Sequence, residues 1–309
     1  MNELPGAQQW LRQVVRALPS IDWPALQQGP RPWLCLNGAH SEALESEVRA
    51  FTKRFDYRWV WRDTAMEYGA PGYRQGPLIV PLDEPLFVHA LDHWLPQQAG
   101  LVLLGPDDAD TLAGHLKGLH QLVGPDGQPV SFSLHAVRQL EELCEGLGPS
   151  RMAEIFGPME RLIWYAGDKR EGEWLTAQNP RASDGGEELG GSPVLTVVDE
   201  EALDQASYAW FMRDVEREFN RRFPEYANAE SQPLLVAHMA TFAHEAQHQL
   251  AFSTERDIRH YMALRFQYPQ DFFAKDTDLK AILVRREVAG RQRLLDAESR
   301  LAELAGLTP

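Results

Sequence analysis

Short apolar runs alternate with segments of helical periodicity between Tyr57 and Gly167. The strand-like runs are five or six residues long and are followed by loop-forming or charged residues: YRWVW, LIVPL, LVLLG and RLIWYA. Between them, segments such as 85–95 repeat their apolar residues at intervals of three and four. This alternation predicts an α/β domain with a mixed sheet and flanking helices, in which the wholly apolar LVLLG forms a central strand.

The residues before this stretch continue the same pattern. WLCLNG, residues 33–38, is typical of a short buried strand that ends at Asn-Gly, and Ser41 precedes an expected helix over 42–54. Apolar residues from Trp10 to Leu18 fall on one helical face, which predicts a helix over 7–18. We therefore assign residues 1–167 to one α/β domain.

The character of the sequence changes at residue 168. Residues 168–193 are polar and rich in Gly, which predicts an exposed linker. Helical periodicity dominates residues 194–309, and only PVLTVV at 193–198 has strand character there. We expect an all-helical C-terminal lobe, with helices over 200–222, 231–251, 254–266 and 277–305.

Composition narrows the classes of partner. The 309 residues carry a formal net charge of −15, which does not fit contact with a phosphate backbone or with anionic lipid. We therefore expect no nucleic-acid partner and no membrane partner. The sequence shows neither an apolar run of about 18 residues nor a signal-peptide pattern, which predicts a cytoplasmic protein. Cys35 and Cys144 are interpreted as small buried residues.

One pattern carries candidate metal chemistry. His244 and His248 stand four residues apart on one expected helical face, where they could hold Zn²⁺ with Glu245 as the general base. A zinc site needs a third protein ligand, and the candidates downstream are His260, Asp271 and Asp276. None of these belongs to a second zinc motif. We interpret the histidines as a structural or surface-exposed pair and keep a zinc-dependent hydrolase as the alternative.

A second histidine pair, His89 and His93, has the same spacing with Asp92 between its members. No glutamate occupies the general-base position there, and amphipathic packing of the helix explains the pattern. The sequence contains no nucleophile elbow, phosphate-binding loop or paired-cysteine motif. We therefore expect no enzymatic activity, no catalytic residue and no cofactor.

Aromatic residues gather in the strand-like run that begins at Tyr57. Strand alternation places Tyr57, Trp59 and Trp61 on one face. Tyr, Trp and Arg dominate the energetic centres of protein interfaces, so this face is a candidate partner-binding surface. Ordinary core packing is the alternative explanation.

Three motifs occur in the order LIVPLDEPLF, GPDGQPVSF and FGPMERLIW. In this order and at this spacing they resemble the domain that defines the adaptor (chaperone) proteins of the bacterial type VI secretion system. The resemblance covers residues 33–167, with a weaker similarity over 235–273. It implies a non-enzymatic carrier whose partners are an effector toxin and the spike (valine-glycine repeat) protein of the secretion machine.

The sequence departs from that family just after Phe132. Family members commonly carry an Arg soon after this Phe and then an aromatic-Asp-Pro-Arg segment. Here Ser133, Ala136 and Val137 stand in that stretch, and only Arg138 is kept. The resemblance therefore adds Arg138 to the candidate partner-binding residues.

Overall fold

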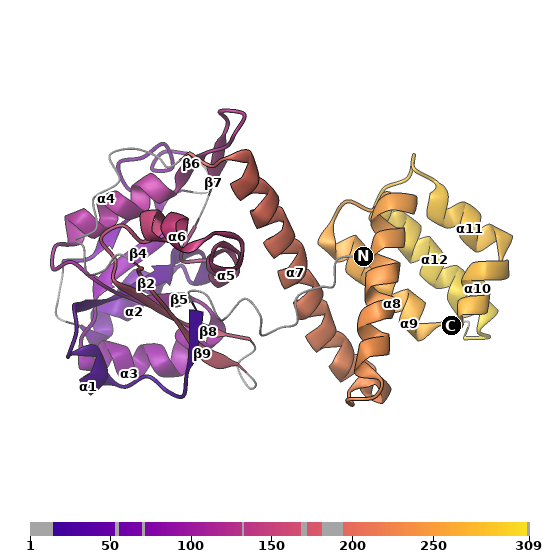
Figure 1. Cartoon of the computed structure of the whole chain (residues 1–309), viewed down its shortest axis with the longest axis horizontal. Coiled ribbons are helices and arrows are strands. Elements are labelled where there is room, and N and C mark those ends of the chain that lie inside the picture. Colours follow the sequence, from indigo (N-terminus) through magenta and orange to yellow (C-terminus); the bar gives the residue numbers. More distant parts are fainter. Residues whose placement is uncertain are drawn as a thin grey trace. The chain divides into compact units, whose positions relative to one another are not determined.

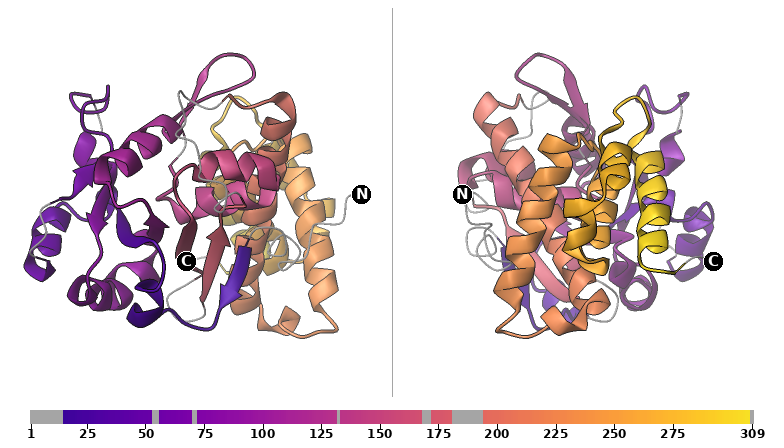
Figure 2. Two further views of the ribbon diagram at one scale, coloured as in Figure 1. Left: turned by 60° about the vertical axis from the view of Figure 1, so that its left-hand side comes forward. Right: turned by 90° about the vertical axis from the view of Figure 1, so that its right-hand side faces the viewer.

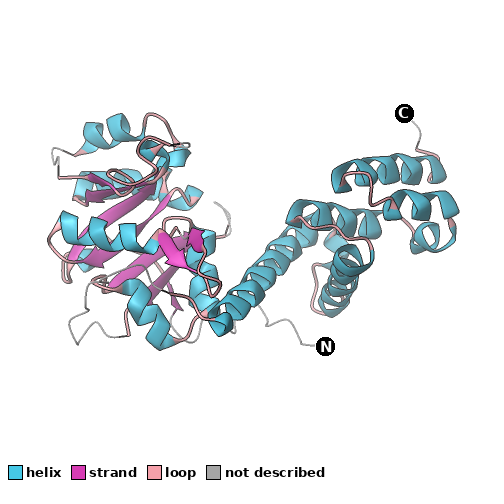
Figure 3. Ribbon diagram, turned by 90° about the horizontal axis from the view of Figure 1, so that it is seen from above, coloured by secondary structure: helices cyan, strands magenta, loops and turns pink. Residues whose placement is uncertain are grey.

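The computed structural model describes residues 15–52, 56–69, 72–131, 133–167, 172–180 and 194–307. The chain forms two compact units, residues 1–210 and 211–309, which we call the sheet unit and the helical unit (Figure 1). Strands occur only in the sheet unit within the described residues (Figure 3). The predicted fold class, an α/β domain followed by a helical lobe, is confirmed.

A seven-stranded sheet organises the sheet unit. Its strands lie in the order β1-β9-β8-β5-β2-β4-β3, and every pairing within it is antiparallel. The predicted mixture of parallel and antiparallel pairs is therefore wrong, although the α/β class holds. The strands of this sheet are β1 (Val15–Leu18), β2 (Arg31–Asn37), β3 (Arg58–Trp59), β4 (Pro77–Pro81), β5 (Gly100–Gly105), β8 (Arg161–Ala166) and β9 (Glu173–Gln178).

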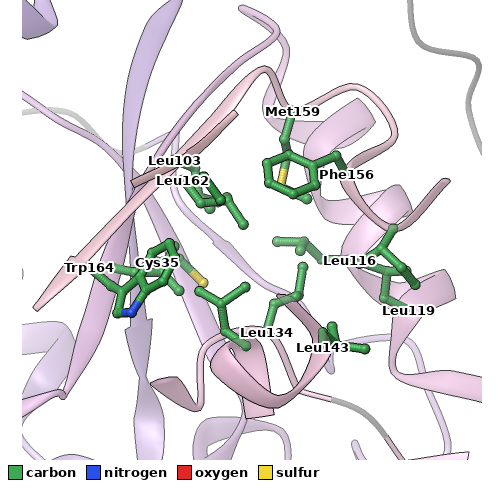
Figure 4. Packing of buried hydrophobic residues seen from close by; sticks show 14 of the residues in the cluster. Cys35, Leu103, Leu116, Leu119, Leu134, Leu143, Phe156, Met159, Leu162 and Trp164 are labelled. Atoms are coloured by element: carbon green, nitrogen blue, oxygen red, sulfur yellow. The ribbon is translucent and has the colours of Figure 1, made fainter. Parts of the chain in front are cut away.

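β5 occupies the middle of the sheet, as the wholly apolar LVLLG predicts. Successive side chains of a strand point to opposite faces, so Leu103 enters one hydrophobic core and Val102 enters the other. Figure 4 shows Leu103 in the first core, together with Cys35 and Trp164. Cys35 and Cys144 are buried free thiols, as predicted.

Helices cover both faces of the sheet. Helices α4, α5 and α6 pack on the core that contains Leu103, and α1, α2 and α3 pack on the core that contains Val102. Asp83 and Asp108 cap α3 and α4 by accepting hydrogen bonds from backbone N–H groups at 3.2 and 2.8 Å. The helices are α1 (Trp23–Leu26), α2 (Leu44–Phe51), α3 (Glu84–His93), α4 (Ala109–Leu119), α5 (Val137–Gly146) and α6 (Pro149–Phe156), with 3₁₀ turns at Gly38–His40, Tyr73–Gln75 and Leu95–Gln97.

A separate hairpin follows α4. It consists of β6 (Gln121–Val123) and β7 (Pro129–Ser131), joined by the turn that Pro125-Asp126-Gly127 predicts. Gly127 adopts a φ of 77°, a conformation that favours glycine. Figure 2 shows this hairpin, in magenta, extending beyond the neighbouring helices.

Two segments of the sheet unit contradict the sequence predictions. Val15–Leu18 forms edge strand β1, whereas we predicted a helix over 7–18, whose first residues lie outside the described ones. β9 lies within the predicted linker 168–193 and pairs with both β8 and β1. The remainder of that linker, except residues 172, 179 and 180, lies outside the described residues. The α/β domain therefore does not end at residue 167.

The boundary between the units falls inside α7 (Val197–Arg222), at residues 210 and 211. The helical unit continues with α8 (Gln232–His244), a π-helical turn (Glu245–Gln249), α9 (Glu255–Gln267), α10 (Gln270–Lys275), α11 (Thr277–Val284) and α12 (Gly290–Leu304), with a 3₁₀ turn at Pro224–Tyr226. The single helix predicted over 277–305 is two helices, because Arg285 leaves the helical conformation with a ψ of 80°. None of the described helices combines the length and apolar content needed to cross a membrane.

Candidate interaction surface

The aromatic run predicted to bind a partner lies at one edge of the sheet. β3 is only Arg58–Trp59, and it pairs with Leu78 and Ile79 of β4. Arg58 donates two hydrogen bonds to the carboxylate of Asp110, at 2.6 and 3.3 Å. A short edge strand that carries a charged side chain resists uncontrolled pairing with other strands. This edge is therefore suited to recognition through side chains.

Tyr57 joins a polar network on α2. Its hydroxyl donates to the Glu45 carboxylate at 2.7 Å, and the Arg49 guanidinium donates to the Tyr57 hydroxyl at 2.6 Å and to Glu45 at 2.7 Å. Arg74, from the 3₁₀ turn before β4, approaches the same carboxylate at 3.8 Å. The hydrogen bond from Tyr57 lowers the pKa of Glu45, with the nearby arginines adding to it and partial burial opposing it.

One more arginine, Arg62, and one more tyrosine, Tyr73, extend this network across the surface. The guanidinium groups of Arg62 and Arg74 lie 5.9 and 5.8 Å from the ring of Tyr73. The side chains of Arg62 and Arg74 are 63% and 67% exposed, so they are accessible to a partner. We call this patch the arginine–tyrosine surface; its members are Glu45, Arg49, Tyr57, Arg62, Glu67, Tyr73 and Arg74.

Sequence reasoning found only Tyr57 among these residues. The others come from α2, from the turn before β4 and from the loop that follows β3, and the sheet brings these segments together. A signal was present, because Tyr73 and Arg74 are adjacent in the Gly-rich stretch GAPGYRQG. Its Gly and Pro content favours a loop, which hides this signal.

Trp59 and Trp61 do not share a face with each other. β3 ends at Trp59, and the chain then turns, with the Thr64 hydroxyl donating to the carbonyl of Trp61 at 2.6 Å. Trp59 is 7% exposed and Trp61 9% exposed, and the two enter opposite cores of the sheet. The predicted common face is wrong because the strand is too short to continue its alternation. Such burial favours core packing over partner contact for both indoles.

Residues 33–154 match the family model DUF4123, a domain of unknown function. Comparison of the chain with curated proteins and with solved structures finds no match. The DUF4123 segment includes the whole arginine–tyrosine surface. It supplies four neighbouring strands of the sheet, β5, β2, β4 and β3, whereas β1, β9 and β8 lie outside it.

Arg138 lies in the DUF4123 segment but contacts a different set of residues. Its guanidinium stacks 4.5 Å from the ring of Trp210 on α7 and donates to Glu142 at 2.7 Å. The neighbouring Glu141 is buried and accepts hydrogen bonds from the indoles of Trp164 and Trp210, at 3.1 and 2.7 Å. Partner binding by Arg138 stays a prediction, while its contacts identify a role in holding α7 against α5.

The residues that depart from the adaptor pattern, Ser133, Ala136 and Val137, lie before or at the start of α5. Ala136 occupies the N-cap position without a side-chain hydrogen bond, and Val137 is buried. The backbone N–H of Ser133 donates to the side chain of Gln139 at 2.9 Å. These positions therefore shape the start of the helix that carries Arg138. Phe132 itself lies outside the described residues.

The HEAQH pattern lies outside the DUF4123 segment, at the end of α8. His244 and His248 are exposed, and their ring centroids are 4.5 Å apart. Glu245, the candidate general base, forms an ion pair with Arg265, which also donates to the hydroxyl of Tyr261 at 2.8 Å. The chain adopts a π-helical turn over Glu245–Gln249 instead of continuing the α-helix.

No third ligand completes a metal site in the described part of the chain. The three candidates are engaged elsewhere: His260 with Glu298 at 3.2 Å, Asp271 with Lys275 at 2.6 Å and Asp276 with Arg300 at 2.8 Å. Among the described residues, no group of three or more His, Cys, Asp and Glu side chains is arranged to hold a metal ion. This geometry does not favour the zinc-dependent hydrolase.

The second histidine pair belongs to an aromatic stack. The ring of His89 lies 4.2 Å from that of His93 and 3.8 Å from that of Phe51, centroid to centroid. Partial burial lowers the pKa of His89, and the neighbouring His93 lowers it further. These contacts agree with the packing interpretation of the pair.

Proposed function

We propose that this protein is a non-enzymatic adaptor that binds a type VI secretion effector and loads it onto the spike protein. The observation that carries this proposal is the resemblance of three motifs to the adaptor domain, and the DUF4123 match over residues 33–154 is consistent with it. Two of the three motifs that resemble the adaptor domain, LIVPLDEPLF and GPDGQPVSF, stand inside the matched segment. The third, FGPMERLIW, follows directly and contributes β8 to the same sheet. The proposed setting is the cytoplasm, where an adaptor would meet its cargo before export.

The arginine–tyrosine surface supports a binding role. Arginine and tyrosine are enriched where protein interfaces concentrate their energy. Here the side chains of Arg49 and Tyr57 are already held by Glu45, so less conformational freedom is lost when a partner binds. The exposed Arg62 and Arg74 remain accessible for contacts with acidic or carbonyl groups of that partner.

An affinity pull-down of the tagged full chain from its native host tests the proposal. We expect mass spectrometry to identify the spike protein or a large toxin among the captured proteins. The double variant Arg62→Glu and Arg74→Glu reverses two exposed charges of the arginine–tyrosine surface and should reduce that capture about tenfold or more. Arg291→Glu, an exposed reversal in the helical unit, is the matched control.

Three results would contradict the adaptor proposal or its assigned surface. Wild-type protein that captures neither the spike protein nor a toxin would contradict the adaptor role. Undiminished capture by the double variant would show that the arginine–tyrosine surface does not contact the partner. Zinc measured on the same samples tests the competing hydrolase: stoichiometric zinc that disappears in His248→Ala would favour a metal site at His244 and His248.

A further inference from the structure

A pocket of about 480 Å³ lies at the end of the sheet where β2 begins and where β4 and β5 end. The antiparallel register places Arg31 opposite Gly105 and Trp33 opposite Pro81, so the loops after β4 and β5 flank the start of β2. Residues of the segment from α1 to β2 line one side of the pocket, which is open to solvent. The lining side chains that matter here are Trp23, Gln27, Arg31, Pro32, Leu82 and Asp107.

The pocket has an apolar wall and one cationic side chain, Arg31, whose charge is neutralised by Asp56. Trp23, Pro32 and Leu82 form the apolar wall, and Trp23 is supported by Phe87 at a ring-centroid distance of 5.7 Å. The Arg31 guanidinium donates to the carbonyl of Asp107 at 2.6 Å and to the Asp56 carboxylate at 3.0 Å. The same group lies 4.5 Å from the ring of Trp33. Arg31 therefore acts as a fixed part of the wall.

Asp107 is the charged lining residue left available for a ligand. Within the described residues, no hydrogen bond or ion pair engages its exposed carboxylate. Three neighbouring carboxylates, those of Asp22, Asp83 and Asp108, are instead used as helix caps. Because these caps carry negative charge near the pocket, its surroundings attract a cation.

We propose that this pocket receives a lysine or arginine side chain of the protein partner. The inference rests on the proposed adaptor function and specifies the chemistry of what it binds. The aliphatic stem of the incoming side chain packs against Trp23 and Leu82, and its charged end reaches the Asp107 carboxylate. Residues 1–210 contain 30 Asp and Glu against 16 Lys and Arg, a charge balance that complements a basic partner.

Nuclear magnetic resonance of the ¹⁵N-labelled full chain tests the pocket directly. The probe is the peptide acetyl-Gly-Gly-Arg-Gly-Gly-amide, and the indole N–H signal of Trp23, assigned with Trp23→Phe, is the readout. We expect the chemical shift of that signal to change with peptide concentration and to reach saturation. Asp107→Asn keeps the side-chain shape and the backbone carbonyl bonded to Arg31, and it should weaken binding about fivefold, the scale of a solvent-accessible ion pair. Asp92→Asn, an exposed change at the far end of α3, should have no effect.

Each remaining outcome overturns a defined part of the proposal. Equal binding of a peptide with Glu in place of Arg, or unchanged binding to Asp107→Asn, would reject a cation pocket. Tighter Asp107-dependent binding of spermidine would assign the pocket to a small free polyamine instead of a protein side chain. Because the titration uses no captured partner, its result is independent of the pull-down, and either proposal can fail without the other.

Discussion

The sheet unit and the helical unit differ in charge as much as in architecture. Residues 1–210 contain 16 Lys and Arg against 30 Asp and Glu, a net charge of −14, whereas residues 211–309 contain 14 against 15, a net charge of −1. The helical unit pairs many of its charges internally, as Arg259 does with Asp214 and Glu218 at 2.6 and 2.8 Å. The excess negative charge of the chain therefore belongs to the sheet unit.

This difference predicts which unit a charged partner would approach. A surface with large net charge attracts oppositely charged proteins and accelerates their encounter, whereas a nearly neutral surface does so weakly. The DUF4123 segment, the arginine–tyrosine surface and the proposed cation pocket all lie in the sheet unit. If the proposed adaptor function holds, charge should matter more for partner binding by the sheet unit than by the helical unit.

The largest expected effect tests whether the two units unfold independently of each other. Trp164 and Phe219 are fully buried, one in each unit, and replacing either with Ala removes a large side chain from a packed core. Each change should cost about 3–5 kcal/mol of unfolding free energy. Hydrogen exchange of the full chain should show Trp164→Ala accelerating exchange in the sheet unit and Phe219→Ala in the helical unit. Equal acceleration in both units by either variant would show one cooperative structure.

Acid should destabilise the sheet unit through His135. Burial, with a smaller contribution from His120, lowers the pKa of His135 to about 4. Below the ordinary pKa of about 6.5 the unfolded chain binds a proton that the folded chain excludes, so stability falls as the pH drops from about 6.5 to about 4. The loss of unfolding free energy should be about 3 kcal/mol. Urea unfolding across this range should show the slope in the wild type, and His135→Gln should flatten it. An unchanged slope in that variant would assign the acid sensitivity to other groups.

The sequence predicted the elements whose patterns are local and missed those that depend on distant pairing. LVLLG identified β5 as the central strand because a wholly apolar run requires cover on both faces. Val15–Leu18 also fits a helical pattern, and only its pairing with Ala177 and its neighbours in β9 makes it a strand. β9 carries polar residues at three of its six positions, Glu173, Thr176 and Gln178, so the sequence offered little sign of it.

The candidate site shows the same limit. The run around Tyr57 could be recognised as aromatic, but the place where β3 ends, and hence the separation of Trp59 from Trp61, is set by pairing with β4. The contact of Glu45 with Arg74 joins residues from two distant segments. In the HEAQH pattern, spacing suggested a zinc-binding helix, while the ion pair of Glu245 with Arg265 on α9 depends on tertiary packing.

A smaller effect is expected where α7 meets α5. Glu141→Gln replaces a carboxylate that accepts hydrogen bonds from the indoles of Trp164 and Trp210, one on each oxygen. An amide has only one oxygen acceptor, so one indole N–H loses its partner. The change should lower the free energy of unfolding by about 1–3 kcal/mol. Trp210 is the last residue of the sheet unit. Hydrogen exchange should therefore rise in α7 before residue 211 and stay unchanged after it. Glu142→Gln, which alters the ion pair with Arg138, is the control and should cost less than about 1 kcal/mol. Faster exchange along all of α7 would contradict a boundary at residue 210.

The smallest expected effect is also the most direct test of the charge difference. Raising the NaCl concentration from low to physiological ionic strength screens repulsion among the excess carboxylates of the sheet unit. We expect the sheet unit to gain less than about 1 kcal/mol of stability, and the nearly neutral helical unit to gain nothing or to lose slightly as its ion pairs are screened. Hydrogen exchange at both salt concentrations would resolve the two units. Glu42→Gln combined with Glu173→Gln removes two exposed negative charges from the sheet unit and should reproduce part of that gain at low salt. If salt stabilised both units equally, the effect would come from general exclusion of solute from the protein surface, and the net charge of the sheet unit would have no measurable part in its stability.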